Sequence, residues 1–331
     1  MDPITHLTTG GLGGRALRGF FPGRAITLLT VTAALVADID NFIGIGNPEL
    51  YLIHHRGITH SLAGGLGIAL ALAGLLRLFS RSIPFWKGVL VAYAGILVHI
   101  FLDLITSYGT QVFAPFTDSR HTVQCVFILD PILTVPLLAL WIGSFVSRRR
   151  GRVLAVTGLC WVLVYPGINF AIRTVLENHL GSRLRAEGVA YDRLELSPEV
   201  LTPFFWKLIL EDPSSYQMTG ISLLEPERPL ELERFQKADR ALLSDLGERA
   251  SYFRTFAWFA AYPVMQAEAD GDRKRLIFGD LRFYSTSASV RRTLGQSASP
   301  FSLTALLDRG GRLIAYEYGR FGGTRLIHRV E

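Results

Sequence analysis

The residues with the clearest chemical potential form one short segment, His54-His55-Arg56-Gly57-Ile58-Thr59-His60-Ser61. Three imidazoles and one guanidinium stand within seven residues, just where a long apolar run begins at Ile58. Basic and imidazole side chains beside a membrane-length segment normally stay in water or line a polar site. One interpretation is a solvated cap that holds a helix end at the lipid head groups. The other is a site that residues elsewhere in the chain complete.

Two carboxylates end the preceding apolar run, in the order Ala37-Asp38-Ile39-Asp40-Asn41. Asp at the C-terminal end of a helix is unfavourable with the helix dipole and gains nothing there as a cap. A bound cation is the simplest reason for two carboxylates at the end of a membrane helix. The alternative is that both are solvated turn residues.

His99 and Asp103 lie four residues apart in another apolar run. This spacing places both on one helix face, at a depth where ionisable residues are costly and usually face an internal polar site. Neutral imidazole and carboxylate are ligands that zinc and related ions accept, although a simple internal hydrogen bond between the two is the alternative. His6 joins this set if the glycine-rich segment Ile4–Phe20 is a helix, because it then lies on the same side of the membrane.

The predicted metal ligands are therefore His6, Asp38, Asp40, His55, His60, His99 and Asp103. Seven such groups exceed what one tetrahedral metal needs, so two or more ions are consistent with the set, and an Asp-x-Asp pair suits a bridge. The predicted cofactor is a divalent metal ion, with zinc as the expected ion. Arg56 is predicted to clamp an anionic substrate, since its planar fork matches phosphate or carboxylate. Binding of lipid head groups by Arg56 is the alternative.

The apolar residues that must position these groups are concentrated in the first half of the chain. Residues 25–176 are mostly Leu, Ala, Val, Ile, Gly and Phe, whereas residues 177–331 are rich in Arg, Glu and Asp. The predicted fold is an α-helical polytopic membrane domain of five to six helices, residues 1–176, followed by a small soluble α+β domain, residues 177–331. The metal site belongs to the first domain.

Runs long enough, or nearly so, to cross a bilayer as helices cover Ala25–Ile39, Ile58–Phe79, Phe85–Thr106, Val126–Val146 and Val153–Leu176. Whether Ile4–Phe20 also crosses is left open by its many glycines. Asp130 before Pro131 is predicted to cap a helix. In the second domain, the segments Ser302–Leu307 and Leu313–Tyr318 predict a β-hairpin. Further strands are expected in Tyr216–Leu224 and Leu276–Tyr284, and helices in Leu232–Leu246 and Ser251–Met265.

Several functional classes are disfavoured by composition. The two cysteines, Cys125 and Cys160, lie in apolar runs and cannot form a secreted-type disulfide framework. A cleavable signal peptide does not fit, because Asp2 stands where a basic region is expected. The net charge of +6 comes from basic residues beside apolar segments, so the expected partner is membrane lipid and a lipid-linked substrate rather than nucleic acid.

Four motifs in order give the chain a family resemblance. They are Asp-x-x-Thr-His at Asp2–His6, Asp-x-Asp at Asp38–Asp40, His-Arg-Gly-x-Thr-His-Ser at His55–Ser61, and His-x-x-x-Asp at His99–Asp103, followed by Thr106 and Gly109. The chain resembles the membrane-bound metal-dependent hydrolases of bacteria and archaea, the inner-membrane group typified by YdjM. The resemblance implies a multi-helix membrane protein with a hydrolase-like metal site, and it implies no particular substrate. One departure is that Val36-Ala37 stands where that family usually has Leu-Pro.

The expected function is a membrane-bound, metal-dependent hydrolase that acts on a lipid or lipid-linked phosphoester or related ester. The alternative is a metal-binding membrane transporter or scaffold without catalysis. A transporter would place its ligands near mid-membrane on broken helices in paired repeats, whereas these ligands lie at helix ends and the sequence has no internal repeat. The expected location is the inner (plasma) membrane, with several crossings.

The distribution of basic residues predicts the orientation. With six crossings, one side collects Arg15, Arg18, Arg24, Arg77, Arg81, Lys87 and the turn 148–152, and the other has only Arg56 and Arg120 in its short loops. Cytoplasmic loops are the ones enriched in Lys and Arg. A reporter fused after Glu331 is therefore expected to be active outside the cytoplasm. Cytoplasmic activity of that reporter would show that the helix count or the orientation is wrong.

Overall fold

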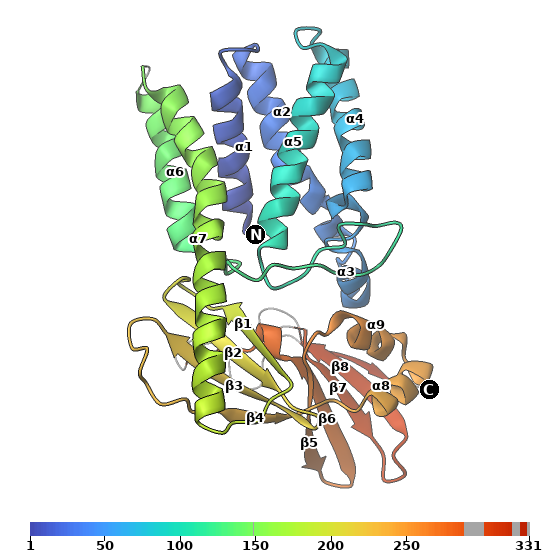
Figure 1. The fold of residues 1–331 in the computed structure, drawn as a ribbon. Coiled ribbons are helices and arrows are strands. Elements are labelled where there is room, and N and C mark those ends of the chain that lie inside the picture. The colour runs from blue at the N-terminus through green and yellow to red at the C-terminus, as the bar shows by residue number, and fades with distance from the viewer. Residues whose placement is uncertain (148, 288–300, 320–324, 330–331) are drawn as a thin grey trace. The chain divides into compact units, whose positions relative to one another are not determined.

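The computed structural model describes residues 1–147, 149–287, 301–319 and 325–329. The chain forms two compact units, one of Met1–Val175 with Val200–Pro203 and one of Leu176–Glu199 with Phe204–Glu331. The first unit is helical and the second contains the β-strands (Figure 1). This confirms the predicted fold class, a helical membrane domain followed by a small α+β domain. Arg148, one of the basic residues of the predicted turn, lies outside the described residues.

The helices of the first unit are α1 Pro3–Leu17, α2 Gly23–Leu35, η1 Val36–Phe42, α3 Pro48–His54, η2 Ile58–His60, α4 Leu62–Phe79, α5 Phe85–Leu104, α6 Pro131–Val146 and α7 Gly151–Ala186, which continues past Val175. In the described part of the chain, four segments are long and apolar enough to cross a membrane: Gly23–Phe42, Leu62–Phe79, Phe85–Leu104 and Gly151–Ala186. In the most apolar 18 residues of each segment, only 22% to 39% is buried inside the protein. Most of these residues therefore keep exposed surface, as contact with lipid requires.

Capping residues determine where several of these helices begin. Asp2 Oδ1 accepts a hydrogen bond from the Thr5 N–H at 3.0 Å, and Ser61 Oγ accepts one from the Gly64 N–H at 2.9 Å. Asp130 caps α6 through the Ile132 N–H at 2.9 Å, as predicted. These bonds satisfy backbone donors that a helix start leaves free. The apolar run predicted to be helical from Val126 therefore becomes α-helix only at Pro131.

Close packing of α1 against α2 draws the short first helix into the bundle (Figure 1). A Cβ added at Gly10 would lie 2.7 Å from the Ala34 Cβ, and one added at Gly14 would lie 2.7 Å from the Thr27 Cα. Glycines four residues apart allow two helix backbones to approach this closely. The segment Ile4–Phe20, ambiguous in sequence, thus contains a helix packed within the bundle.

The loop that connects α5 to α6 forms hydrogen bonds to the backbone of the histidine-rich segment, residues 54–61. Arg120 Nη2 donates to the carbonyl oxygens of Leu52 at 2.6 Å and of His55 at 3.1 Å. The Gln111 N–H donates to the Arg56 carbonyl oxygen at 2.9 Å. These bonds tie residues 52–56 to a loop that is far away in sequence. The position of the segment is therefore fixed by tertiary contacts as well as by the short helices α3 and η2.

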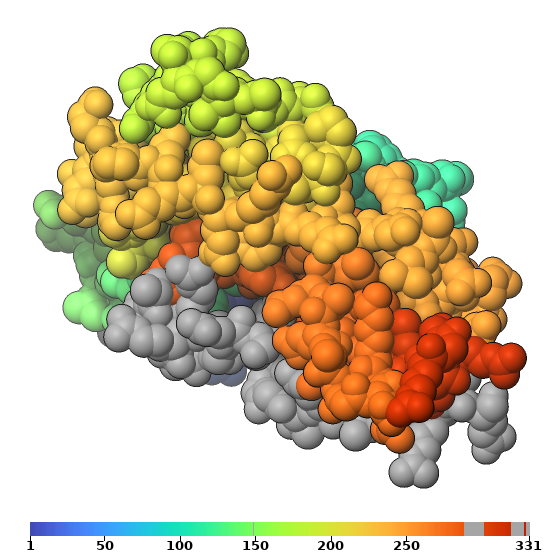
Figure 2. Space-filling model, turned by 90° about the horizontal axis from the view of Figure 1, so that it is seen from below, coloured from blue at the N-terminus to red at the C-terminus, as the bar shows by residue number. Residues whose placement is uncertain are grey.

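The second unit contains two antiparallel sheets in sequential strand order. The first consists of β1 Arg193–Pro198, β2 Phe205–Glu211, β3 Ser215–Ser222 and β4 Glu233–Gln236, and the second of β5 Pro263–Asp270, β6 Arg273–Asp280, β7 Leu303–Leu307, β8 Leu313–Gly319 and β9 Arg325–Arg329. Helices α8 Arg240–Arg249 and α9 Ser251–Phe259 and the short η3 Leu281–Phe283 complete the unit. Figure 2 shows the face on which the gold segment between β3 and α9 borders the orange hairpin of β5 and β6.

The predicted hairpin of this unit is confirmed, since β7 and β8 pair antiparallel with Leu303 opposite Tyr318. Strands were also correctly expected in Tyr216–Leu224 and Leu276–Tyr284, although the second ends at Asp280. The two predicted helices were wrong in part. Residues 233–236 pair with β3 as an edge strand, and residues 263–270 pair with β6. The pairing of these segments with neighbouring strands overrides a helical spacing of apolar residues.

Substitution of Gly10 should destabilise the membrane unit. A Gly10→Val side chain overlaps Ala34 and the backbone of α2, and overpacking of this kind costs about 1–3 kcal/mol. Gly13→Ala is the matched control, because a Cβ at Gly13 would meet its nearest atoms, in Thr30, only at 3.8 Å. Thermal unfolding of both variants in detergent checks this. Equal melting temperatures for Gly10→Val and Gly13→Ala would contradict the close approach of α1 and α2.

Candidate metal centre

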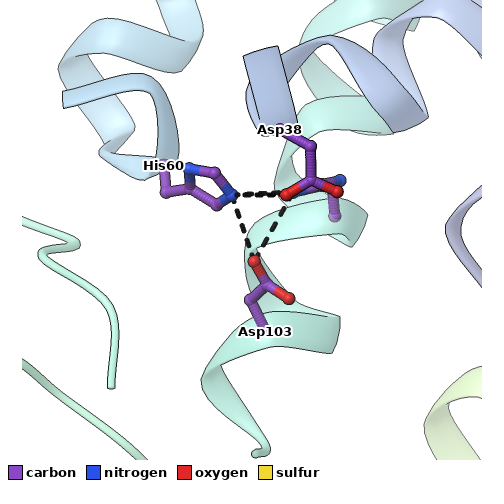
Figure 3. Close-up of side chains that lie close together, drawn as sticks. Asp38, His60 and Asp103 are labelled. Atoms are coloured by element: carbon purple, nitrogen blue, oxygen red, sulfur yellow. Dashed lines mark hydrogen bonds and ion pairs between the residues drawn. The ribbon is translucent and has the colours of Figure 1, made fainter. Parts of the chain in front are cut away.

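The structure brings the predicted site residues together from distant parts of the membrane unit. Asp38 and Asp40 lie on η1, and His55 and Arg56 follow α3. His60 ends η2, His99 and Asp103 lie on α5, and His6 lies on α1. Figure 3 shows three of them, Asp38, His60 and Asp103, pointing toward one another. The exposed His54, at the end of α3, stays outside this cluster.

Four of these residues form the centre of the cluster. One ligand atom from each of Asp38, His60, His99 and Asp103 lies within 4.8 Å of the other three. His60 Nε2 is 3.0 Å from His99 Nε2, 3.1 Å from Asp103 Oδ2 and 3.5 Å from Asp38 Oδ1. In a tetrahedral zinc site with bonds of about 2.0–2.1 Å, ligand atoms lie about 3.3 Å apart. His99 Nε2 also lies 3.5 Å from Asp103 Oδ2 and 3.9 Å from Asp38 Oδ1, so the four residues are placed where they could hold one metal ion.

Hydrogen bonds behind the two histidines determine which ring nitrogen faces the centre. His99 Nδ1 lies 2.7 Å from the Ala34 carbonyl oxygen, which can only accept, so Nδ1 carries the proton. His60 Nδ1 faces Asp40 Oδ2 at 3.0 Å and carries its proton for the same reason. With both Nδ1 atoms protonated, the Nε2 atoms of His60 and His99 face each other across 3.0 Å, so a proton or a cation must lie between them. A metal ion bound by both lone pairs would take the place of that proton, so these residues fit a metal ion.

The electrostatics of the centre also favour a cation. Burial opposes a positive charge on His60, but its hydrogen bonds to Asp103, Asp38 and Asp40 outweigh burial and raise the pKa of His60 to about 10. Burial lowers the pKa of His55 in spite of its bond to Asp40. The positive charge is thus drawn to the middle of the cluster rather than to its edge. The carboxylates that attract a proton to this position also attract a metal ion, whose binding displaces the proton.

Asp40 lies behind the centre, and its carboxylate has four hydrogen-bonding partners. Its Oδ2 accepts from the Arg56 N–H at 3.0 Å and from Thr59 Oγ1 at 2.7 Å, and it faces His60 Nδ1. Its Oδ1 lies 2.9 Å from His55 Nδ1. These contacts engage the lone pairs that a metal ligand needs. The geometry of Asp40 therefore suits a residue that orients His60 and His55.

A second group of potential ligands shares one residue with the first. Ligand atoms of Asp38, Asp40 and His55 also lie within 4.8 Å of one another. Asp38 belongs to both groups, so its carboxylate is the one that could bridge two ions. The bonds that Asp40 and His55 already make to each other make this second group the weaker of the two.

His6 forms the wall of the centre on the side of α1. Its ring stacks on His99 with the centroids 3.8 Å apart, and its Nε2 lies 3.3 Å from Asp103 Oδ1. The Met1 amino group contacts the same oxygen. His6 is fully buried, and apart from the approach of its Nε2 to Asp103 its ring has no polar partner among the described residues, so its Nδ1 is unpaired. Since an unpaired buried polar atom is costly, a ligand or substrate that pairs with Nδ1 would remove this cost.

Arg56 is buried beside Asp103. Its Nη2 lies 2.9 Å from Asp103 Oδ1, and its Nη1 donates to Thr106 Oγ1 at 2.8 Å and to the Asp103 carbonyl oxygen at 3.1 Å. The guanidinium lies over the Tyr108 ring, 5.1 Å from its centroid. Its backbone has a φ of 59°, which is uncommon for a residue other than glycine. The predicted clamp is thus held rigidly next to the centre, with part of its donor capacity already used by Asp103.

Sequence reasoning missed several contributors to the site. Thr59 and Tyr108 contact Asp40 and Arg56, and the Ala34 carbonyl orients His99. Thr59 had a signal, its place in the His-Arg-Gly-x-Thr-His-Ser motif. Gly57 in the same motif is needed because an added Cβ would lie 2.7 Å from the His54 carbonyl oxygen. A backbone carbonyl and a single tyrosine leave no such signal.

Comparison with known proteins finds a match over the part of the chain that holds this cluster. The family model of the YdjM inner membrane protein matches residues 1–176, more than half of the 331 residues and the whole of the cluster. The chain belongs to the YdjM family of inner membrane proteins. The expected family is thus confirmed, and it is a family of inner membrane proteins. The His/Asp cluster of this YdjM-family chain could hold a metal ion.

The chain is also similar to one curated bacterial protein, whose printed name assigns it no activity. The chain is 30% identical over 202 residues to the uncharacterized protein YfhP of Bacillus subtilis (strain 168). The match covers 59% of this chain and 60% of that protein, so it spans less than two thirds of the relative's length. No solved structure matches the chain.

The two kinds of carboxylate should differ in their effect on metal content. Asp103→Asn removes a ligand charge from the centre, so detergent-purified protein should lose nearly all bound metal. Asp40→Asn leaves the four central residues intact but weakens the orientation of His60, so metal affinity should fall by about 10- to 100-fold. Elemental analysis and metal titration measure both effects, with the exposed Asp118→Asn as the control. A folded Asp103→Asn protein with full metal content would exclude Asp103 as a ligand.

Proposed function

We propose that this protein is a membrane-bound metal-dependent hydrolase that acts on a lipid or lipid-linked phosphoester, or a related ester. The observation that carries the proposal is the centre of Asp38, His60, His99 and Asp103. Three of its side chains are at most 1% exposed, whereas Asp38 is 22% exposed. Asp38 is thus the side on which water and substrate could reach the centre, and a catalytic metal site needs such access.

The proposed division of labour follows from the contacts of each residue. Asp38, His60, His99 and Asp103 would hold the metal ion, for which we propose zinc, since the set combines imidazole and carboxylate. When bound, the ion supplies Lewis acidity that polarises a phosphoryl or carbonyl oxygen and makes water a better nucleophile near neutral pH. Asp40 holds the Nδ1–H of His60 and so keeps the Nε2 of that ring directed at the centre. Arg56 would stabilise negative charge that develops on the substrate.

The place of the centre along the helices supports a lipid substrate. His99 and Asp103 lie in the last two turns of α5, and His60 is separated from α4 only by the capping residue Ser61. The basic residues Lys87 and Arg77 lie at the opposite ends of the same two helices. A site at a helix end lies at the depth of lipid head groups. Because Lys and Arg favour the cytoplasmic side, we propose that the centre and the C-terminal unit are extracytoplasmic.

A screen of the purified protein tests this function. Detergent-purified protein should contain a divalent metal and hydrolyse at least one member of a panel of phospholipids, lipid-linked phosphates and carboxylic esters. Removal of the metal with a chelator should abolish the activity, and addition of zinc should restore it. Metal binding without hydrolysis of any substrate in the panel would favour the alternative, a non-catalytic transporter or scaffold.

Arg56 provides the sharpest test of catalysis as distinct from metal binding. Arg56→Lys keeps the positive charge beside Asp103 but loses the planar fork. We expect normal metal content with turnover reduced by about 10- to 1,000-fold, as for loss of one charge-stabilising donor. Arg81→Lys, an exposed change on the basic side of the unit, is the matched control. If Arg56→Lys instead strips the metal, Arg56 supports Asp103 and is not a substrate clamp.

A further inference from the structure

A cavity of about 350 Å³ opens beside the metal centre, between α1 and α5. We name it the α1–α5 groove; the residues lining it include His6, Gly13, Thr30, Ala94, Val98 and His99. Its volume falls in the range of about 300–1,000 Å³ that is usual for small-molecule sites. His6 and His99 are also part of the cluster that surrounds Asp103. The groove is therefore continuous with the candidate metal centre.

Away from these two histidines the groove is apolar. Its only other polar lining residues are Thr9 and Thr30, in the described part of the chain. Thr9 Oγ1 donates to the Thr5 carbonyl oxygen at 2.7 Å, and Thr30 Oγ1 to the Ile26 carbonyl oxygen at 3.1 Å. Both hydroxyl protons are thus used within their own helices. A polar ligand would find little to bind along this wall, whereas a hydrocarbon chain would fit it.

The groove reaches the outer surface of a membrane span. Leu90 and Ala94 line it and belong to α5, and Leu90 is 59% exposed. An apolar residue that is exposed on a membrane-spanning helix faces lipid rather than water. The mouth of the groove therefore opens to the hydrocarbon region, and its inner end meets the imidazole of His6 beside Asp103.

Two glycines of α1 that lie in this region differ in function. Gly10 is required for the approach of α1 to α2, as its 2.7 Å contact with Ala34 shows. Gly13 is not, because an added Cβ would find its nearest atoms only at 3.8 Å. The absence of a side chain at Gly13 leaves space within the groove. Close packing of α1 against α2 therefore does not account for the glycine at position 13.

We infer that the α1–α5 groove binds the acyl chain of a membrane phospholipid and thereby holds the phosphoester or ester of that lipid at the metal centre. The inference rests on the proposed function and deepens it, since it makes the substrate a phospholipid that enters sideways from the bilayer. Hydrocarbon outside the groove is as apolar as the groove itself. The groove therefore contributes the position of the chain rather than a hydrophobic gain.

Photocrosslinking tests the occupant without reliance on activity. The protein is reconstituted in vesicles of phosphatidylethanolamine and phosphatidylglycerol that contain phosphatidylglycerol with a diazirine on one acyl chain. Mass spectrometry should find crosslinks concentrated on the groove-lining residues of α1 and α5. Gly13→Leu fills the groove and should remove them. Gly67→Leu is the matched control, because an added Cβ there meets no atom within 4 Å, and it should leave them unchanged.

A second groove variant guards against misfolding. If Gly13→Leu does not fold, Ala94→Leu narrows the opposite wall from an exposed position on α5, and it should reduce the same crosslinks. Metal content equal to wild type shows that either variant is folded around an intact centre. Labelling spread evenly over α4 and the groove, and unchanged by Gly13→Leu, would overturn the inference and leave only bulk lipid contact.

Turnover then separates the two proposals. The ratio of phospholipid hydrolysis to hydrolysis of a soluble phosphoester should fall by about 10- to 100-fold in Gly13→Leu, since a displacement of roughly 1 Å at the reacting centre can cost a factor of about 100. An unchanged ratio would overturn the groove as a substrate site. Localised crosslinks in a wild-type protein that hydrolyses none of the substrates would refute the proposed function while the lipid site stands.

Discussion

The buried carboxylate of Asp103 is the constraint on which the rest of the membrane unit depends. It is 1% exposed, and a charge so far from water is tolerated only when it is paired and hydrogen-bonded. Its Oδ1 faces Arg56 and His6, and its Oδ2 faces His60 and His99. His6 comes from α1, Arg56 and His60 come from the segment around η2, and His99 lies one turn earlier on α5, so one charge requires these three elements to meet. The carboxylates of Asp38, Asp40 and Asp103 face the guanidinium of Arg56, the His60 ring and the Met1 amino group, so a metal ion would displace protons that these carboxylates otherwise hold nearby.

The backbone at the end of α2 provides several groups of the site that surrounds this charge. α2 gives way to a 3-10 helix at Val36, which carries Asp38 and Asp40. The same change leaves the Ala34 carbonyl near the end of the helix, where carbonyls lack partners within their own helix, and His99 bonds it at 2.7 Å. The end of α2 therefore supplies a candidate ligand, an orienting carboxylate and the acceptor that fixes the tautomer of His99. The apolar helices of the bundle serve as the frame that keeps these groups dry and aligned.

The residues of the site were predictable from sequence wherever a regular helix or a short motif determined their position. His99 and Asp103 share a helix face because they are four residues apart. His60 lies in the short His-Arg-Gly-x-Thr-His-Ser motif, so its position relative to His55 and Arg56 is restricted. Sequence could not predict that Asp38 faces the centre as a candidate ligand whereas Asp40 lies behind it. This difference depends on the 3-10 helix η1 and on the Arg56 N–H, which donates to Asp40. In the second unit the same limit made β4 look helical, because the partner strand that decides its structure is distant in sequence. The groove left no periodic signal at all, because it is a space between helices.

The first helix shows why a site of this kind can be hidden in an unpromising sequence. α1 has only 15 residues and carries buried threonines and glycines, a composition that does not partition strongly into a bilayer. Its Thr8 and Thr9 hydroxyls bond carbonyls one turn earlier in the helix, so the polar side chains are satisfied without neighbours. Gly10 and Gly14 let α1 lie against α2, and that contact carries His6 to the centre. α1 is therefore held by packing rather than by its own hydrophobicity. α1 contains few large apolar residues because it is buried among other helices, where it carries His6 at the candidate metal centre and Gly13 beside the groove.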